Sequence, residues 1–175
     1  MTRLTADGLL RTAAVLVSES PGRPAEADLR RAVSTAYYAV FCALGEELAK
    51  AYDEPLSRSV RRLLSHSGVL EVFGRLTRAD RGTSTRVLRW HPDQPVCDAD
   101  LLRSADACRW LLGAREDADY DHLTSHTKQE AEKAVVRARL AISQIRRAAT
   151  NSPQQVQAVC IALIASPASR RRLSA

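Results

Sequence analysis

The spacing of apolar residues along the chain predicts helices from end to end. The clearest period lies in residues 24–52, where apolar side chains recur every three or four positions. They are Leu29, Val33, Ala36, Tyr37, Val40, Phe41, Leu44 and Leu48. A stripe of this kind covers one face of an amphipathic helix. Residues 5–20 repeat the period and end at Pro21-Gly22, so the chain begins with two helices.

A third helix is expected over residues 57–76, with Ser57 as its cap and Ser67-Gly68 as a point where it can kink. The period is then lost over residues 77–97, which contain Gly82, Pro92 and Pro95. A connection of this length is either functional or mobile.

Three further helices each begin with a start signal. The signals are Asp98, the Thr127–Glu130 capping box and Ser152-Pro153. The first of these helices is expected to end before Leu123, and the second is expected through about Ala149. The third is short and apolar, and it leads into the basic tail Arg170-Arg171-Arg172.

These elements predict an all-α fold. We expect an up-and-down bundle of five main helices plus a short C-terminal helix, because short connections favour antiparallel neighbours. Residues 1–150 would form the bundle, and residues 151–175 the terminal helix and tail. The composition agrees, since 175 residues suit one domain and 7 Gly, 7 Pro and 5% aromatic residues are too few for a β-sandwich or barrel.

Charge is distributed in blocks. The net charge is +6, and 23 of the 26 basic residues are Arg. Basic blocks at residues 58–97 and 133–175 bracket an acidic block at residues 98–132. This layout can build a surface that faces phosphate groups, or it can let helices pair charges across the fold. The Arg content fits phosphate binding, and it fits the codon use of a high-GC genome equally well.

The four cysteines form no Cys-x-x-Cys pair and are expected to be reduced packing residues. His91, Cys97 and Cys108 have the spacing of no zinc motif, so neither a metal nor another cofactor is predicted. No leader peptide and no apolar segment of membrane-spanning length is evident, so a cytoplasmic protein with no membrane partner is expected.

Two motifs on these helices suggest a family. The second helix reads LRRAVSTAYYAVFCAL, and the fourth ends in AREDADYD. In this order and separation they resemble the HEPN domain (higher eukaryotes and prokaryotes nucleotide-binding). The chain is most similar to small prokaryotic members with a tyrosine pair and a later Arg-x-x-Ala-Asp-Tyr element. The resemblance covers about residues 5–148.

The resemblance implies a dimeric helical bundle, often a metal-independent endoribonuclease of a toxin–antitoxin or phage-defence system. Such proteins frequently pair with a nucleotidyltransferase-type antitoxin. Their signature is Arg, four to six residues, then His, which corresponds to Arg115 and His122. Arg115 would clamp phosphate, His122 would act as acid or base, and Tyr120 would support them. In the commoner order His precedes Tyr, whereas here Tyr120 precedes His122.

These residue types suit the reaction. Cleaving RNA without a metal requires a base for the 2′-hydroxyl, an acid for the 5′-oxygen and a cation for the phosphorane. Arg115 and His122 are seven residues apart, so a continuous helix would place them on one face. One Arg and one His suffice if a dimer supplies two copies of each. RNA and a second copy of the chain are therefore the expected partners.

The same residues also have structural interpretations. Asp119, four positions after Arg115, can form a salt bridge with it within the helix. Tyr37 lies on the apolar stripe, which favours a core aromatic with a tethered hydroxyl. His66 falls inside the third predicted helix, which favours a partly exposed structural histidine.

Residues 77–97 offer a second candidate contact with RNA. Arg side chains follow phosphates, and Trp stacks on unpaired bases. The candidates are Arg78, Arg81, Arg86, Arg89 and Trp90. The alternative is a solvated loop with Trp90 folded back on the bundle.

Two other functions remain open. The chain can be a non-catalytic helical module that binds a nucleotidyltransferase or another defence component. Its terminal helix would then be the docking surface, through Val156, Val159, Cys160, Leu163 and Ile164. The hypothesis that the chain is a helical DNA-binding regulator depends on its charge alone, because the sequence contains no clear helix-turn-helix pair.

Overall fold

Every regular element of the computed structural model is an α-helix, within the residues that it describes. These are residues 4–18, 24–50, 52–53, 56–80 and 98–167, with the side chains of 78–80 excepted. Seven helices form there: α1 (Ala6–Ser18), α2 (Glu26–Ala49), α3 (Leu56–Leu63), α4 (His66–Asp80), α5 (Ala99–Tyr120), α6 (Lys128–Asn151) and α7 (Pro153–Ala165). The predicted all-α class is confirmed.

The third predicted helix is two helices, so the expectation of one helix over residues 57–76 is wrong. α3 ends at Leu63 and α4 begins at His66. Ser65 causes the break, because its hydroxyl accepts a hydrogen bond from the Gly68 N–H at 2.9 Å and so caps α4. The chain therefore interrupts its helix just before Ser67-Gly68, where the sequence suggested only a kink.

Ser57 does not cap α3, because the helix begins at Leu56 and includes Ser57, but the start signals of the last three helices are confirmed. Asp98 caps α5 by accepting from the Leu101 N–H at 2.9 Å. Thr127 and Glu130 form both hydrogen bonds of the capping box at the start of α6. Pro153 is the first residue of α7. Local sequence therefore determines where these three helices begin.

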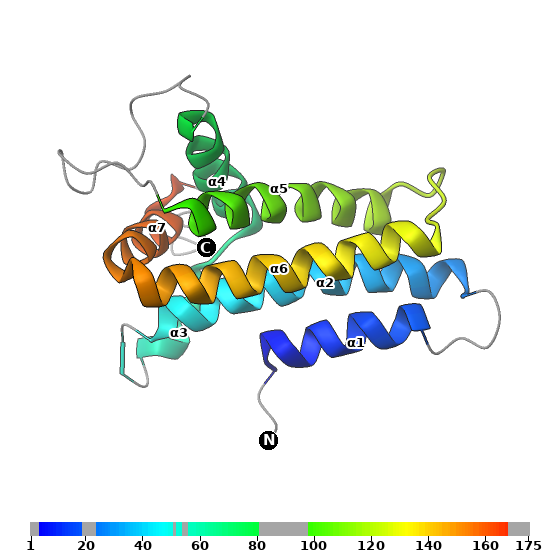
Figure 1. Cartoon of the computed structure of the whole chain (residues 1–175), viewed down its shortest axis with the longest axis horizontal. Helices are drawn as coiled ribbons and strands as arrows, with labels where there is room; N and C mark the ends of the chain where they lie inside the picture. Colours follow the sequence, from blue (N-terminus) through cyan, green and yellow to red (C-terminus); the bar gives the residue numbers. More distant parts are fainter. Residues whose placement is uncertain (1–3, 19–23, 51, 54–55, 81–97, 168–175) are drawn as a thin grey trace.

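α2 is the central helix. It packs against α1, α5 and α6, and Figure 1 shows these four helices lying side by side along the long axis of the molecule. α1 and α2 run in opposite directions, as do α5 and α6. Four alanines along one face of α2, Ala32, Ala36, Ala39 and Ala43, are at most 1% exposed and let a neighbouring helix approach closely.

α7 belongs to the same core as the other helices. It packs against α2, α4 and α6. Val159, Cys160 and Leu163 are each at most 4% exposed, and Val156 is also buried. Four of the five residues of the predicted docking stripe therefore face the core and do not form an open surface, and the fifth, Ile164, is partly buried against that core.

No disulfide joins the described cysteines. Burial raises the pKa of Cys108 to about 12, and burial with the nearby Glu47 raises the pKa of Cys160 to about 12. Both therefore remain neutral packing residues, as predicted, while Cys97 lies outside the described residues. Among the helices of the described ranges, none combines the length and apolar character needed to cross a membrane.

Candidate functional site

The guanidinium of Arg115 joins the two sequence motifs. Arg115 lies on α5, and its Nη2 donates to the hydroxyl of Tyr38 on α2 at 3.1 Å. It also donates to the hydroxyl of Tyr120 at 3.2 Å. The Cζ atom lies 5.0 Å from the ring centre of Tyr120 and 5.7 Å from that of Tyr38. The two tyrosines thus hold the guanidinium by hydrogen bonds and by cation–π attraction.

Asp119 neutralises part of this charge. Its Oδ2 lies 2.7 Å from Arg115 Nε, an ion pair that lacks the alignment of a hydrogen bond. The predicted pair four residues apart is therefore confirmed. The Ser34 hydroxyl donates to the same oxygen at 3.3 Å. Burial lowers the pKa of Arg115, but the hydroxyls of Tyr120 and Tyr38 and the charge of Asp119 raise it overall, so the guanidinium stays charged.

Tyr37 is the buried member of the tyrosine pair. It is 0% exposed, and its hydroxyl lies 2.7 Å from Nδ1 of His66. Burial raises the pKa of this hydroxyl far above its usual value, so it stays protonated. The expectation of a core aromatic with a tethered hydroxyl is confirmed.

His66 lies beside both tyrosines. It is half-buried, as expected, but it is the first residue of α4 and not an internal helical residue. Its ring centre is 4.6 Å from that of Phe41 and 5.7 Å from that of Tyr38, which it meets edge-on. The residues that meet here are hereafter the Arg115–His66 cluster: Arg115, Tyr120, Tyr38, Tyr37 and His66.

His66 could not be assigned to this cluster from the sequence, because its position depends on the break between α3 and α4. The only local signal was Ser65, a capping residue immediately before it. A break at Ser65 turns the chain so that the first residue of α4 reaches the tyrosine pair on α2.

His122 lies outside the helix that carries Arg115. α5 ends at Tyr120, and Asp121 adopts an extended conformation. The assumption that one continuous helix places Arg115 and His122 on one face is therefore wrong. His122 is exposed in the following turn, and no hydrogen bond or ion pair between described residues joins it to Arg115. The structure thus joins Arg115 and Tyr120 by a hydrogen bond and places His122 in the exposed turn that follows α5.

The turn that carries His122 is ordered by its own side chains. Asp121 accepts from the Leu123 N–H at 2.9 Å and from the Thr124 hydroxyl at 2.6 Å. The Thr124 hydrogen bond and then the Leu123 N–H lower the pKa of Asp121. Asp121 is therefore ionised near neutral pH and keeps this turn closed.

Arg30 attaches the same turn to α2, a role that sequence reasoning missed. Its Nη1 donates to the carbonyl oxygens of Ala118 and Asp121 at 3.0 and 2.9 Å, and its Nη2 donates to that of Thr124. Its Nε pairs with Glu26 at 3.1 Å. Arg30 therefore satisfies the Ala118 carbonyl, which the end of α5 leaves without a helical partner, and two carbonyl groups of the following turn.

The second candidate contact with RNA lies mostly outside the described residues. Arg81, Arg86, Arg89 and Trp90 belong to the segment that the structure does not describe. Arg78 is in α4, but its side chain is also not described.

Opposite charges pair across the fold, which was one of the two interpretations of the charge blocks. Arg147 on α6 forms two hydrogen bonds to Asp100 on α5, at 2.9 and 3.0 Å. Arg146 forms two to Asp7 on α1, at 3.1 and 3.0 Å. Hydrogen bonds from Arg147, followed by those from Arg103, lower the pKa of Asp100. Part of the basic block therefore serves the fold.

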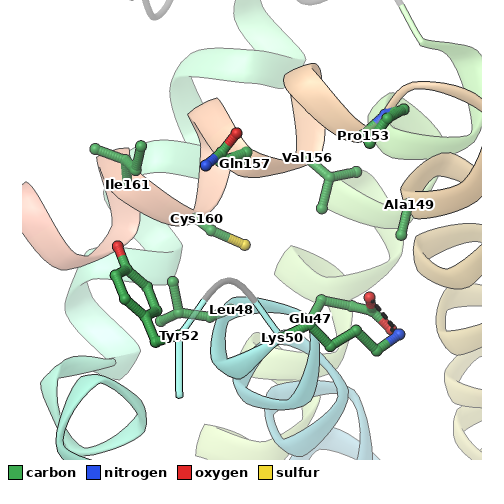
Figure 2. A pocket seen from close by; sticks show the side chains of 10 residues that line it. All are labelled: Glu47, Leu48, Lys50, Tyr52, Ala149, Pro153, Val156, Gln157, Cys160 and Ile161. Carbon is green, nitrogen blue, oxygen red and sulfur yellow. Dashed lines mark hydrogen bonds and ion pairs between the residues drawn. The ribbon is translucent and has the colours of Figure 1, made fainter. Parts of the chain in front are cut away.

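A separate cleft of about 260 Å³ lies between the ends of α2 and α6 and the side of α7. Figure 2 shows Cys160 pointing into it, with Leu48 and Val156 nearby. Both carboxylate oxygens of Glu47 accept from Lys50 Nζ at 2.7 Å. The cleft is mostly apolar, and its one described acid is already paired, so the Arg115–His66 cluster is the better candidate site for phosphate chemistry.

Within the described part of the chain, no group of three or more His, Cys, Asp or Glu side chains is placed to hold a metal ion. Comparison of the chain with family models, curated proteins and solved structures gives no match.

Proposed function

We propose that this chain is a HEPN-type endoribonuclease that works without a metal, as a cytoplasmic homodimeric bundle in a toxin–antitoxin or phage-defence system. One observation carries the proposal. The two motifs that resemble the HEPN family, far apart in the sequence, meet at the hydrogen bond between Arg115 and Tyr38. A charged guanidinium fixed by side chains from two helices is a preorganised binding group for phosphate.

Arg115 keeps binding capacity in this arrangement. Its described partners use Nε and Nη2, and no described residue accepts from Nη1. The Nη1 N–H groups can therefore donate to a phosphate oxygen while Asp119 and the tyrosines hold the rest of the fork. Tyr120, which is 67% exposed, can add its hydroxyl to the same phosphate.

His122 supplies the imidazole in this proposal. Because it is exposed in the turn after α5, it can approach the scissile linkage from the same chain or across a dimer axis. Arg78, Arg81, Arg86, Arg89 and Trp90 would bind flanking nucleotides, and a nucleotidyltransferase-type antitoxin or another defence protein would restrain the activity.

The test is RNA cleavage by the purified protein in excess chelator. We expect the double variant Arg115→Ala, His122→Ala to lower the single-turnover rate by at least about 10²-fold, because both a charge clamp and a proton-transfer group are lost. Arg103→Ala is the matched control, since Arg103 is an exposed arginine near the other end of α5, paired with Asp100. Unchanged cleavage by the double variant would reject the assignment.

A further inference from the structure

Two large apolar side chains lie on the solvent-exposed side of α6. Val136 is 51% exposed and Leu140 is 55% exposed. They are four residues apart, so they are neighbours on one stripe of the helix. The buried residues of α6, among them Ala138 and Ile142, lie on its opposite side. Single exposed apolar residues are ordinary, whereas neighbouring ones can form the centre of an interface.

Basic side chains flank this apolar stripe on both sides. Figure 1 shows α6 running between α5 and α1, with which it packs. On the side of α5, the Arg137 Cζ and the Lys133 Nζ lie 4.3 and 5.3 Å from the ring centre of Trp110. On the side of α1, Arg139 lines a groove together with Leu10. These residues are hereafter the α6 outer face: Lys133, Val136, Arg137, Arg139 and Leu140.

The described residues do not neutralise the cations of this face. The ion pairs between α6 and its neighbouring helices use Arg146 and Arg147. Within the described part of the chain, Lys133, Arg137 and Arg139 take part in no ion pair. From residue 133 to its end, α6 contains no Asp or Glu. The face therefore combines an apolar centre with a basic edge on each side.

We infer that the α6 outer face docks an amphipathic helix of a partner protein, one with an apolar stripe flanked on both sides by Asp or Glu. The apolar stripe of such a helix would pack on Val136 and Leu140, and its carboxylates would pair with the two basic edges. The face contains no residue of the Arg115–His66 cluster. The inference therefore goes beyond the proposed function and does not depend on it.

Three other occupants fit this face less well. The phosphates of RNA would pair with the basic edges but would leave the apolar centre without a partner. A membrane surface needs a larger apolar area than two side chains supply. A second copy of the chain can offer the exposed acids of α5, Asp106 and Asp117. These are eleven residues apart and share one stripe of α5, so they can meet only one of the two basic edges.

The experiment measures binding of two fluorescently labelled helical peptides to the full chain. In the first peptide, leucines share one stripe and Glu residues flank them. The second has the same composition, but its leucines are distributed around the helix. We expect the first peptide to have a Kd at least about tenfold lower by fluorescence anisotropy, because only this peptide buries apolar surface while it pairs its charges. Equal Kd values would overturn the inference.

Variants of the chain locate the binding surface. The double variant Val136→Ala, Leu140→Ala should raise the Kd of the first peptide by at least about tenfold, because it removes the apolar centre while Ala preserves the helix. Leu70→Ala is the matched control, at a leucine of α4 that is 48% exposed, and it should change the Kd by less than about twofold. A double alanine variant that binds as tightly as the unaltered chain would overturn the inference.

The basic edges have their own test. The double variant Arg137→Gln, Arg139→Gln should weaken binding of the first peptide and make its Kd less dependent on salt, because charged residues at the rim of an interface act through screened attraction. Arg103→Gln, at the exposed arginine of α5, is the control and should leave both properties unchanged. An unchanged salt dependence in the double Gln variant would show that the edges do not recognise acidic residues.

The same double alanine variant distinguishes the other occupants. Its binding to a short oligouridine, its binding to vesicles that contain phosphatidylglycerol, and its sedimentation are compared with those of the unaltered chain. We expect all three to be unchanged. Loss of RNA binding, of vesicle binding or of a dimer in this variant would assign the α6 outer face to that occupant and overturn the inference. RNA cleavage in chelator tests the proposed function separately, so the two can fail independently.

Discussion

Arg30 shows how one side chain can order a distant turn. Its guanidinium donates to carbonyl groups of Ala118, Asp121 and Thr124, so the start of α2 holds the segment that follows α5. His122 lies within this segment. The position of the proposed catalytic imidazole therefore depends on a residue that needs no contact with substrate.

We expect Arg30→Met to lower the free energy of unfolding by about 1 to 3 kcal/mol, because partly buried carbonyl groups lose a charged donor while the apolar stem is kept. Amide exchange at residues 121–124 should accelerate more than in the core of α2, since the turn loses its attachment. Chemical denaturation and hydrogen exchange measure both effects. Arg31→Met, at the exposed neighbouring arginine, is the control. Equal stability of the two variants would contradict this role of Arg30.

Sequence reasoning found the contacts of the site that are local along the chain. The pair between Arg115 and Asp119 follows from helical spacing, and the pattern of apolar residues placed Tyr37 in the core. The contacts between Arg115 and Tyr38 and between Tyr37 and His66 join different helices. Such contacts depend on how helices pack, which spacing along one helix cannot reveal.

Among the elements, the boundary between α3 and α4 matters most for the site. Apolar residues continue in one register across it, so periodicity alone indicated a single helix. The Ser65 cap overrides that pattern by starting a new helix at His66. The starts of α5 and α6 were predictable because each has a capping side chain, and the start of α7 was predictable because Pro153 suits the first turn of a helix.

We expect Ser65→Ala to destabilise the protein by about 1 kcal/mol, the usual cost of losing a side-chain cap. The start of α4 should fray, and the ring of His66 should lose its fixed position beside Tyr37. Thermal unfolding measures the first effect, and the histidine NMR resonances measure the second. Ser67→Ala is the control, because Ser67 is an exposed serine in the same turn. A Ser65→Ala protein with unchanged stability and unchanged His66 resonances would show that the cap does not set this boundary.

At the scale of the whole molecule, the hydrophobic core extends through α7. Apolar residues of this helix are buried against helices from the N-terminal and middle parts of the chain. The sequence suggested a docking surface because an apolar stripe has the same pattern whether it faces the core or a partner. Only the packing of α2, α4 and α6 around α7 decides between these two interpretations.

The contribution of α7 can be measured at Leu163, which is 1% exposed. We expect Leu163→Ala to lower the free energy of unfolding by about 2 to 5 kcal/mol, because a buried cavity replaces the side chain. A single cooperative transition should remain, since α7 shares one core with the other helices. Gln157→Ala, at an exposed position of the same helix, should change stability by less than about 0.5 kcal/mol. Two results would contradict this role of α7: a Leu163→Ala variant whose free energy of unfolding changes as little as that of Gln157→Ala, or a separate unfolding transition for α7. Either would show that the terminal helix is an appendage available to a partner.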